Sequence, residues 1–157
     1  MAWSASKIFR AYTAGVLTTT VDFDILNDVL KVALYNNSVT PDSNASAANT
    51  AYNADQWAAA NEVAQAGQWD AGGVALNNQV VSAATADTVF LDADNVSSNS
   101  AATLADVYGA LLYDDTLAAP VADQGIGFVY FGGANSVVSG TFTILWSANG
   151  ILRYVNT

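Results

Sequence analysis

Carboxylates are the plentiful side chains in this sequence that could perform acid–base chemistry. Three pairs lie close together along the chain: Asp22 and Asp24, Asp92 and Asp94, and Asp114 and Asp115. Two carboxyl groups can hydrolyse a glycosidic bond when the pKa of one of them is raised. Aspartate is also favoured in turns, because its side chain bonds the nearby backbone. The turn-like sequence around the last two pairs favours the structural role, and a carboxylate-based glycosidase stays a remote alternative.

A cation site is the second chemistry that these residues could support. Asp92, Asp94 and Asn95 place three oxygen-bearing side chains close together, as calcium requires. An EF-hand loop would continue with Gly at its sixth position and Glu at its twelfth, where this chain has Ser97 and Thr103. We therefore interpret the segment as a polar turn, and we expect neither a metal nor a cofactor.

Aromatic side chains are the remaining candidates for binding. Tyr52, Trp57 and Trp69 lie in loop-like sequence, where aromatic residues either pin a loop onto its domain or form a contact surface. As a contact surface, they could stack on saccharide rings. Phe142 and Trp146 share one face of a predicted strand, and we expect both of them in the core.

The overall composition excludes many classes of function. The chain has 157 residues, with 14 acidic and 4 basic side chains, a formal net charge of −10, and neither Cys nor His. It therefore has no means of thiol or Ser-His-Asp catalysis, and no Cys or His to bind zinc. The acidity argues against nucleic acid as a partner. We find neither a signal peptide nor the run of roughly 20 apolar residues that a membrane helix needs, so we expect a protein made in the cytoplasm.

The elements that must position these side chains fall into two parts. Apolar residues at helical spacing predict a short amphipathic helix over residues 4–17, namely Ala5, Ile8, Phe9, Tyr12 and Val16. From residue 21 onwards short apolar runs separated by turn signals predict strands at 21–25, 29–35, 73–82, 88–91, 107–113, 127–131, 141–146 and 151–155.

The connections between these strands also carry predictions. A long loop at residues 36–60 has one helical turn near 55–60, and Asn149-Gly150 predicts a hairpin between the last two strands. The whole chain then forms one domain over residues 1–157. We expect it to be mainly β, an antiparallel β-sandwich or barrel with a short N-terminal helix.

Several phrases of the sequence occur in a characteristic order. They are SASKIFRAY at residues 4–12, KVALYNN at 31–37, TPD at 40–42, AANTAY at 47–52, NEV at 61–63, AGG at 71–73, VYGALLYDDT at 107–116 and GTFTILWSANGI at 140–151. In this order the chain resembles small β-rich virion structural proteins of tailed bacteriophages. The resemblance implies a non-enzymatic part of the particle, and it brings no catalytic residues with it.

Capsid decoration, on the outside of the head, is the role that we favour from this resemblance. A minor tail protein or a host-facing adhesin that binds surface saccharide is the alternative. The expected partners are other virion proteins, above all the major capsid protein. We expect a homo-oligomer. The analogy with decoration proteins that lie at local symmetry axes predicts a trimer.

The charge is divided unevenly between the two parts of the chain. Residues 1–20 contain Lys7 and Arg10 and no acid, a formal charge of +2. Residues 21–157 contain all 14 acidic residues and two basic ones, a formal charge of −12. We therefore predict that the N-terminal helix docks on a partner through Lys7, Ile8, Phe9, Arg10 and Tyr12. The alternative is an ordinary helix that closes one end of the β-rich body.

Overall fold

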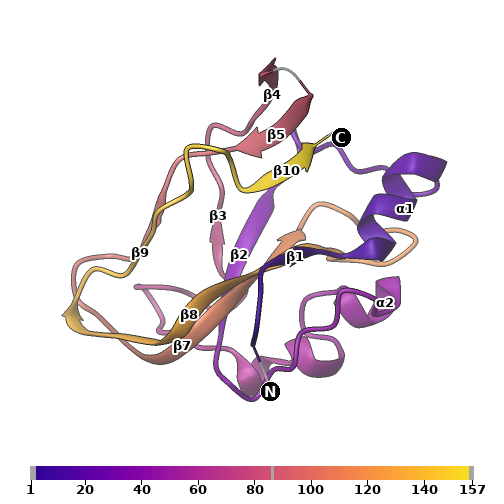
Figure 1. Cartoon of the computed structure of the whole chain (residues 1–157). Helices are drawn as coiled ribbons and strands as arrows, with labels where there is room; N and C mark the ends of the chain where they lie inside the picture. Colours follow the sequence, from indigo (N-terminus) through magenta and orange to yellow (C-terminus); the bar gives the residue numbers. More distant parts are fainter. Residues whose placement is uncertain (1–2, 86, 156–157) are drawn as a thin grey trace.

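Two long antiparallel strands, β7 (Ala102–Asp114) and β8 (Gly125–Gly140), run through the middle of the fold (Figure 1). The structure is a computed structural model, and it describes residues 3–85 and 87–155. The two strands belong to a five-stranded antiparallel sheet with the order β1-β8-β7-β2-β3. The other members are β1 (Lys7–Ile8), β2 (Leu30–Tyr35) and β3 (Val74–Ala75).

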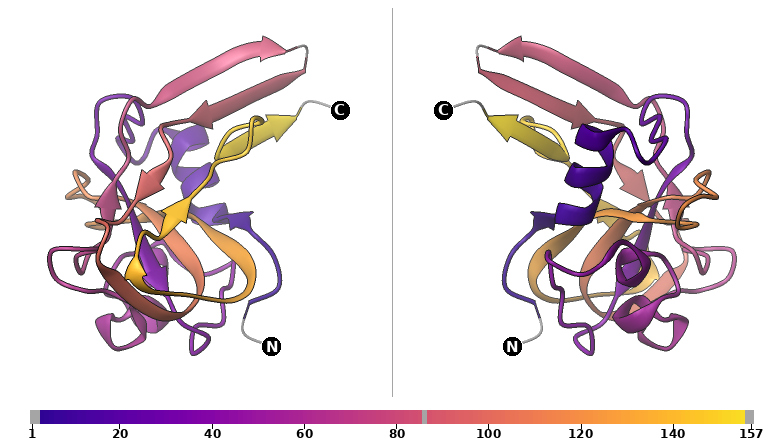
Figure 2. Two further views of the ribbon diagram at one scale, coloured as in Figure 1. Left: turned by 90° about the vertical axis from the view of Figure 1, so that its left-hand side faces the viewer. Right: turned by 90° about the vertical axis from the view of Figure 1, so that its right-hand side faces the viewer.

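Two smaller antiparallel sheets complete the β structure. One has the order β10-β5-β4 and consists of β4 (Val80–Thr85), β5 (Thr88–Asp92) and β10 (Leu152–Val155). The other pairs β6 (Val96–Ser97) with β9 (Thr143–Ile144). Figure 2 shows the hairpin of β4 and β5 projecting beyond the rest of the molecule. The mainly β, antiparallel class is confirmed. Of the two predicted architectures, the barrel is wrong, because β1 and β3 are the two open edges of the large sheet, and the sandwich stays a prediction.

The core lies around β2 and the second half of β7. In β2 the side chains from Val32 to Tyr35 are all buried, as expected for a strand covered on both faces. The predicted long loop covers one of these faces. It contains α2 (Ala47–Thr50) and two 3-10 turns, η1 (Asp55–Trp57) and η2 (Ala59–Asn61), which confirm the helical turn expected near 55–60. The Tyr35 hydroxyl donates to the Trp57 carbonyl at 2.6 Å and ties the loop to the sheet.

The N-terminal helix begins six residues later than the sequence predicts. Helix α1 spans Arg10–Thr18, whereas residues 4–9 are extended. Within this extended segment Lys7 and Ile8 pair with β8, and the Phe9 amide donates to the Ile126 carbonyl at 3.0 Å. The edge of the large sheet thus satisfies the backbone groups that a helix would have used.

The predicted strand at residues 21–25 is also wrong. The side chains do alternate between half-buried and exposed, and Phe23 packs against Tyr12 with ring centroids 4.8 Å apart. However, Asp24 closes a turn: its carbonyl accepts the Asp28 amide at 2.7 Å, while its own amide donates to the Asp28 carboxylate at 2.8 Å. The aspartates therefore direct the backbone into a turn instead of a ladder.

The predicted hairpin between residues 141–146 and 151–155 does not form. The first segment pairs through β9 with β6, and the second pairs through β10 with β5. The turn between them closes from the Gly150 amide to the Ser147 carbonyl at 2.8 Å. Gly150 has a φ of 82°, but Asn149 is not among the residues with positive φ, as the predicted type I′ turn would need. Each of the two segments thus pairs with a strand distant in the sequence instead of with the other.

Candidate functional site

The five residues predicted to dock on a partner lie in three different environments. Phe9 and Tyr12 are buried in the core, and Ile8 is half-buried. Lys7 and Arg10 are exposed, and the Arg10 guanidinium donates to the Asn44 side chain at 3.1 Å. The prediction is therefore wrong for the two aromatic residues, because they fill the protein's own interior. The two cations stay accessible to a partner.

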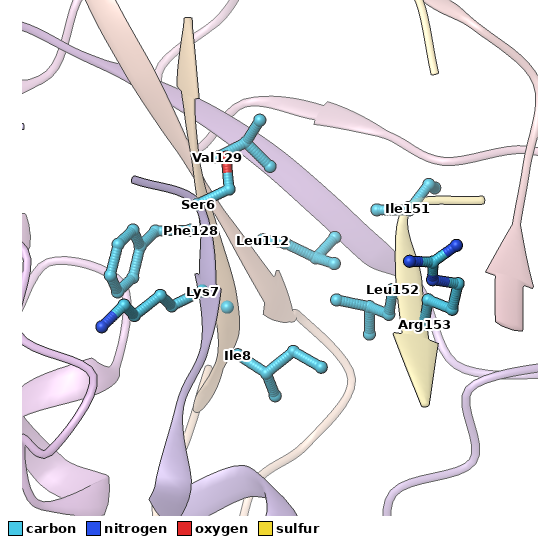
Figure 3. Close-up of a pocket in the computed structure, with 10 residues that line it drawn as sticks. Ser6, Lys7, Ile8, Leu112, Phe128, Val129, Ile151, Leu152 and Arg153 are labelled. Carbon is cyan, nitrogen blue, oxygen red and sulfur yellow. The ribbon is translucent and has the colours of Figure 1, made fainter. Parts of the chain in front are cut away.

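Ile8 faces a cleft between the large sheet and β10 (Figure 3). Its side chain and those of Leu112 and Leu152 point into this gap of about 220 Å³, whereas the side chain of Lys7 lies on the opposite face of its strand. The cleft is thus an apolar seam between two sheets.

An exposed apolar surface lies beside this seam, where α1 approaches the β10-β5-β4 sheet. We call it the docking surface and define it by Val16, Leu17, Val89 and Tyr154. These residues line a shallow hollow of about 300 Å³, and each of them is exposed. No acidic side chain lines the hollow among the residues that the structure describes.

The strand register explains why this surface is apolar. Tyr154 pairs with Val89 and Leu152 pairs with Leu91, so all four side chains share one face of the small sheet. The inner pair, Leu91 and Leu152, is buried in the core. The outer pair continues the same apolar face beyond the core, and Leu17 on α1, 78% exposed, extends it. A contiguous exposed apolar patch is typical of a site that another molecule covers.

Two of the three aromatic side chains predicted to form a contact surface are buried in the protein. Trp57 and Trp69 are fully buried, and their rings meet Tyr35 at 5.1 Å and Phe142 at 6.0 Å respectively, both edge to face. A contact surface made of these two side chains is therefore wrong, and they pin the loop onto the sheets instead. Tyr52 is half-buried and stacks on Tyr113 at 5.0 Å.

Tyr52 belongs to a polar cluster that closes the other end of the loop. Its hydroxyl donates to one carboxylate oxygen of Glu62 at 2.9 Å, and the Gly72 amide donates to the other at 2.8 Å. The Tyr113 hydroxyl donates to the Gly72 carbonyl at 2.6 Å. Burial raises the pKa of Glu62, although both of its hydrogen bonds favour the ionised form. These contacts hold the loop together and give each carboxylate oxygen of Glu62 a hydrogen-bond donor.

Two of the carboxylate pairs are engaged in local structure. Asp24 accepts a hydrogen bond from Asn27 at 2.7 Å in the turn before β2. Asp115 forms a salt bridge with Lys31 at 2.8 Å. Asp114 is buried, and its Oδ1 accepts the amides of Thr116 and Leu117 at 3.0 and 3.1 Å. Each carboxylate thus stabilises a turn or a strand end.

Asp114 is nevertheless an unusual carboxyl group. Its Oδ2 is buried and accepts no hydrogen bond from the described residues. Burial, followed by the neighbouring Asp28 carboxyl, raises the pKa of Asp114 to about 6. A protonated Asp114 can donate to Asp28, whereas two ionised carboxylates repel each other.

The candidate cation turn is held by hydrogen bonds of its own. The Asp92 carboxylate accepts the Ala93 amide at 3.0 Å, and the Asp94 carboxylate accepts the Asn78 side chain at 2.6 Å. Asn95 accepts the Trp146 amide at 2.9 Å. No group of three or more acidic side chains that could hold a metal ion occurs in the described part of the chain. Residues 93–95 form an irregular connection between β5 and β6 instead of the predicted turn, and Asp94 and Asn95 bond residues distant in the sequence.

An aromatic cleft is the feature that the sequence interpretation missed. It has a volume of about 340 Å³ and is lined by Val129, Tyr130, Phe131, Asn135, Phe142, Thr143, Ile144, Leu145 and Trp146. Phe142 and Trp146 were expected in the core, but both are half-buried and line this cleft. Their strand alternation correctly places them on one side of the chain. It cannot reveal that the residues of β8 beside them leave part of that side uncovered.

Comparison of the chain with protein-family models, with curated proteins and with solved structures found no match. None of the helices in residues 3–85 and 87–155 has the length and apolar character needed to cross a membrane. Function must therefore be argued from the surfaces described above.

Proposed function

We propose that the protein is a non-enzymatic structural protein of a tailed-bacteriophage particle, a capsid decoration protein bound to the outside of the head. The observation that supports this proposal is the docking surface. Its residues are exposed although they continue the apolar face of a strand pair whose inner residues belong to the core. Covering such a surface with another protein recovers roughly 25 cal/mol for each Å² of apolar area.

The charges of the chain are consistent with addition to a finished shell. A formal charge of −10 keeps free subunits apart in solution. Lys7 and Arg10 are exposed and make no salt bridge within the described residues. In this proposal they meet acidic groups of the major capsid protein, while the docking surface supplies the apolar contact. The protein is made in the host cytoplasm and joins the virion as a homo-oligomer, for which the analogy with decoration proteins predicts a trimer.

A matched pair of substitutions tests the docking surface. Leu17→Asp places a charge in the surface, whereas Val138→Asp places one at an equally exposed position on β8, 79% exposed and outside the docking surface. We expect Leu17→Asp to weaken binding to particles prepared without the protein by roughly tenfold or more, since burying an unpaired charge is costly. Val138→Asp should bind like the wild type, in a sedimentation assay of particle-bound protein.

Two results would contradict the proposal. One is equal binding of both variants and the wild type. The other is a wild-type protein that does not bind particles at all. Far-ultraviolet circular dichroism of both variants checks that each is folded before the comparison is made.

The aromatic cleft favours a second candidate, a minor tail protein or host-facing adhesin that binds surface saccharide. The side chains of Phe131, Phe142 and Trp146 line this cleft, and such side chains can stack on sugar rings. An adhesin would occur in few copies on the tail, whereas a decoration protein would occur in many copies on the head. Imaging of labelled particles distinguishes the two.

A further inference from the structure

The aromatic cleft has a lining suited to a small neutral ligand. Phe131, Phe142 and Trp146 supply aromatic surface, and Leu145, 74% exposed, forms part of the rim. None of the nine lining residues carries a charge. In a chain with a net charge of −10, such a lining disfavours anionic ligands and offers no carboxylate to a cation.

The cleft also offers hydrogen-bonding groups that the fold leaves available. Asn135 donates through Nδ2 to the Gly133 carbonyl at 2.9 Å, while its Oδ1 accepts no hydrogen bond from the described residues. Thr143 adds a hydroxyl that already bonds Ser97 at 2.8 Å. A ligand with both an apolar face and hydroxyl groups would contact the aromatic side chains and also bond the polar groups of the cleft.

The fold holds the aromatic side chains in place before any ligand binds. The Trp146 indole N–H donates to the Asp94 carbonyl at 3.0 Å, and the Trp146 amide is bound by Asn95. Phe131 and Phe142 contact each other with ring centroids 6.3 Å apart. Side chains that are already ordered lose little conformational entropy on binding, so their contacts contribute more fully to affinity.

A bulge in β8 creates the space. Between the pairs Gly109↔Tyr130 and Val107↔Asn135, strand β8 advances five residues while β7 advances two. The extra residues of β8 include Gly132 and Gly133, which have φ values of 82° and 147°. Bulges redirect side chains and are frequent beside binding sites. This bulge separates Phe131 from Asn135, so that the ring and the amide approach the cleft from different points of the strand.

From these observations we propose that the aromatic cleft between β8 and β9 is a binding site for a neutral saccharide. A sugar ring presents C–H groups on its faces and hydroxyl groups around its edge, which matches aromatic rings beside an amide oxygen and a hydroxyl. The volume of about 340 Å³ is at the small end of ligand pockets, so the site takes one or two sugar rings. The inference rests on the second candidate function, for which it names the class of saccharide, and it does not depend on the decoration role.

A glycan array carrying neutral and acidic glycans tests the proposal. The biotinylated protein is presented as a tetramer on streptavidin, because a small site binds weakly and multivalency raises the signal. We expect retention on neutral glycans and none on sialylated or uronic-acid glycans. For the best neutral glycan, titration of the monomer should shift the indole N–H resonance of Trp146 in a ¹H–¹⁵N spectrum.

Substitutions in the cleft provide the specific test. Phe131→Ala removes an aromatic ring and should weaken binding roughly tenfold or more. Leu145→Asp, at an exposed rim position that should tolerate the change, should weaken it similarly. Val138→Asp adds the same charge on β8 outside the cleft and should leave binding unchanged.

Three results would overturn the proposal: no neutral glycan retained by the wild type, a preference for acidic glycans, or equal loss in Leu145→Asp and Val138→Asp. Each of these results leaves the particle-binding test of Leu17→Asp unaffected, so the two proposals fail independently.

Discussion

At the scale of single residues, Asp114 is a carboxyl group whose charged form is disfavoured both by burial and by the neighbouring Asp28. Its pKa is raised to about 6, so the folded protein binds a proton there more tightly than the unfolded chain does. The stabilisation from this proton is complete below the unfolded pKa near 4 and is lost as the pH rises through 6. We predict that Asp114→Asn is more stable than the wild type at pH 8, on the order of 1 kcal/mol, because the amide cannot repel Asp28.

Urea unfolding at pH 5 and pH 8 measures this difference. At pH 5 the wild-type carboxyl is largely protonated, so the advantage of the variant should shrink. The Asn side-chain oxygen can still accept the amides of Thr116 and Leu117, which keeps the turn intact. Asp115→Asn is the control, because it removes a neighbouring charge that forms the Lys31 salt bridge and should not stabilise. A variant equally or less stable than the wild type at pH 8 would contradict the assignment.

The sequence predicted some residue roles and missed others for a physical reason. The helical turn near residues 55–60 depends on neighbouring residues, and it was predicted correctly. Burial of Trp57 and opening of the cleft beside Trp146 depend on segments distant in sequence, with which each ring packs. Spacing along one strand contains no information about those segments.

At the scale of elements, the pairing of β2 with β3 depends on Gly73. This residue has a φ of 82°, and a Cβ there would overlap the backbone of Val32. We predict that Gly73→Ala lowers the free energy of unfolding by about 2 kcal/mol or more, from backbone strain and steric overlap together.

Gly67→Ala separates these two causes. Gly67 has a similar φ of 74°, but a Cβ there would meet nothing within 4 Å. Gly67→Ala should lower the free energy of unfolding by about 1 kcal/mol, from backbone strain alone. Equal losses in the two variants, measured by urea unfolding, would show that the close approach of β3 to β2 is not what requires glycine.

Elements were predicted best where one apolar run is covered on both faces. Strands β2 and β7 follow from such runs, at residues 30–35 and 107–113. The start of α1 and the pairing of β9 and β10 were predicted wrongly, because the edge of the large sheet and strands β5 and β6 supply partners that local patterns do not encode. Deletion of residues 1–20 would therefore remove Trp3, Phe9 and Tyr12 from the core, and it cannot serve as a test of docking.

At the scale of the whole molecule, net charge should govern how stability depends on salt and pH. The chain carries a formal charge of −10, and burial raises the pKa values of Glu62, Asp114 and Asp123. Both effects predict a protein that is more stable at pH 5 than at pH 8 in low salt. Added NaCl should raise the melting temperature more at pH 8, where repulsion is greatest. A melting temperature that rises from pH 5 to pH 8 in low salt would contradict this account.

The mainly β class and the uneven charge were predictable from composition and pattern. The docking surface was not, because it combines α1 with β5, which begins 70 residues after α1 ends, and with β10, which begins 60 residues after β5 ends. The proposed role in a particle rests on the resemblance, and the docking surface is the structural feature that supports it.

The central proposal is that this protein decorates the outside of a phage head. Electron microscopy of particles labelled with a gold-conjugated antibody against the protein tests it most directly, because one image gives both location and copy number. The proposal predicts label distributed over the head, in tens to hundreds of copies per particle. Label confined to the tail, or a head without label, would contradict it.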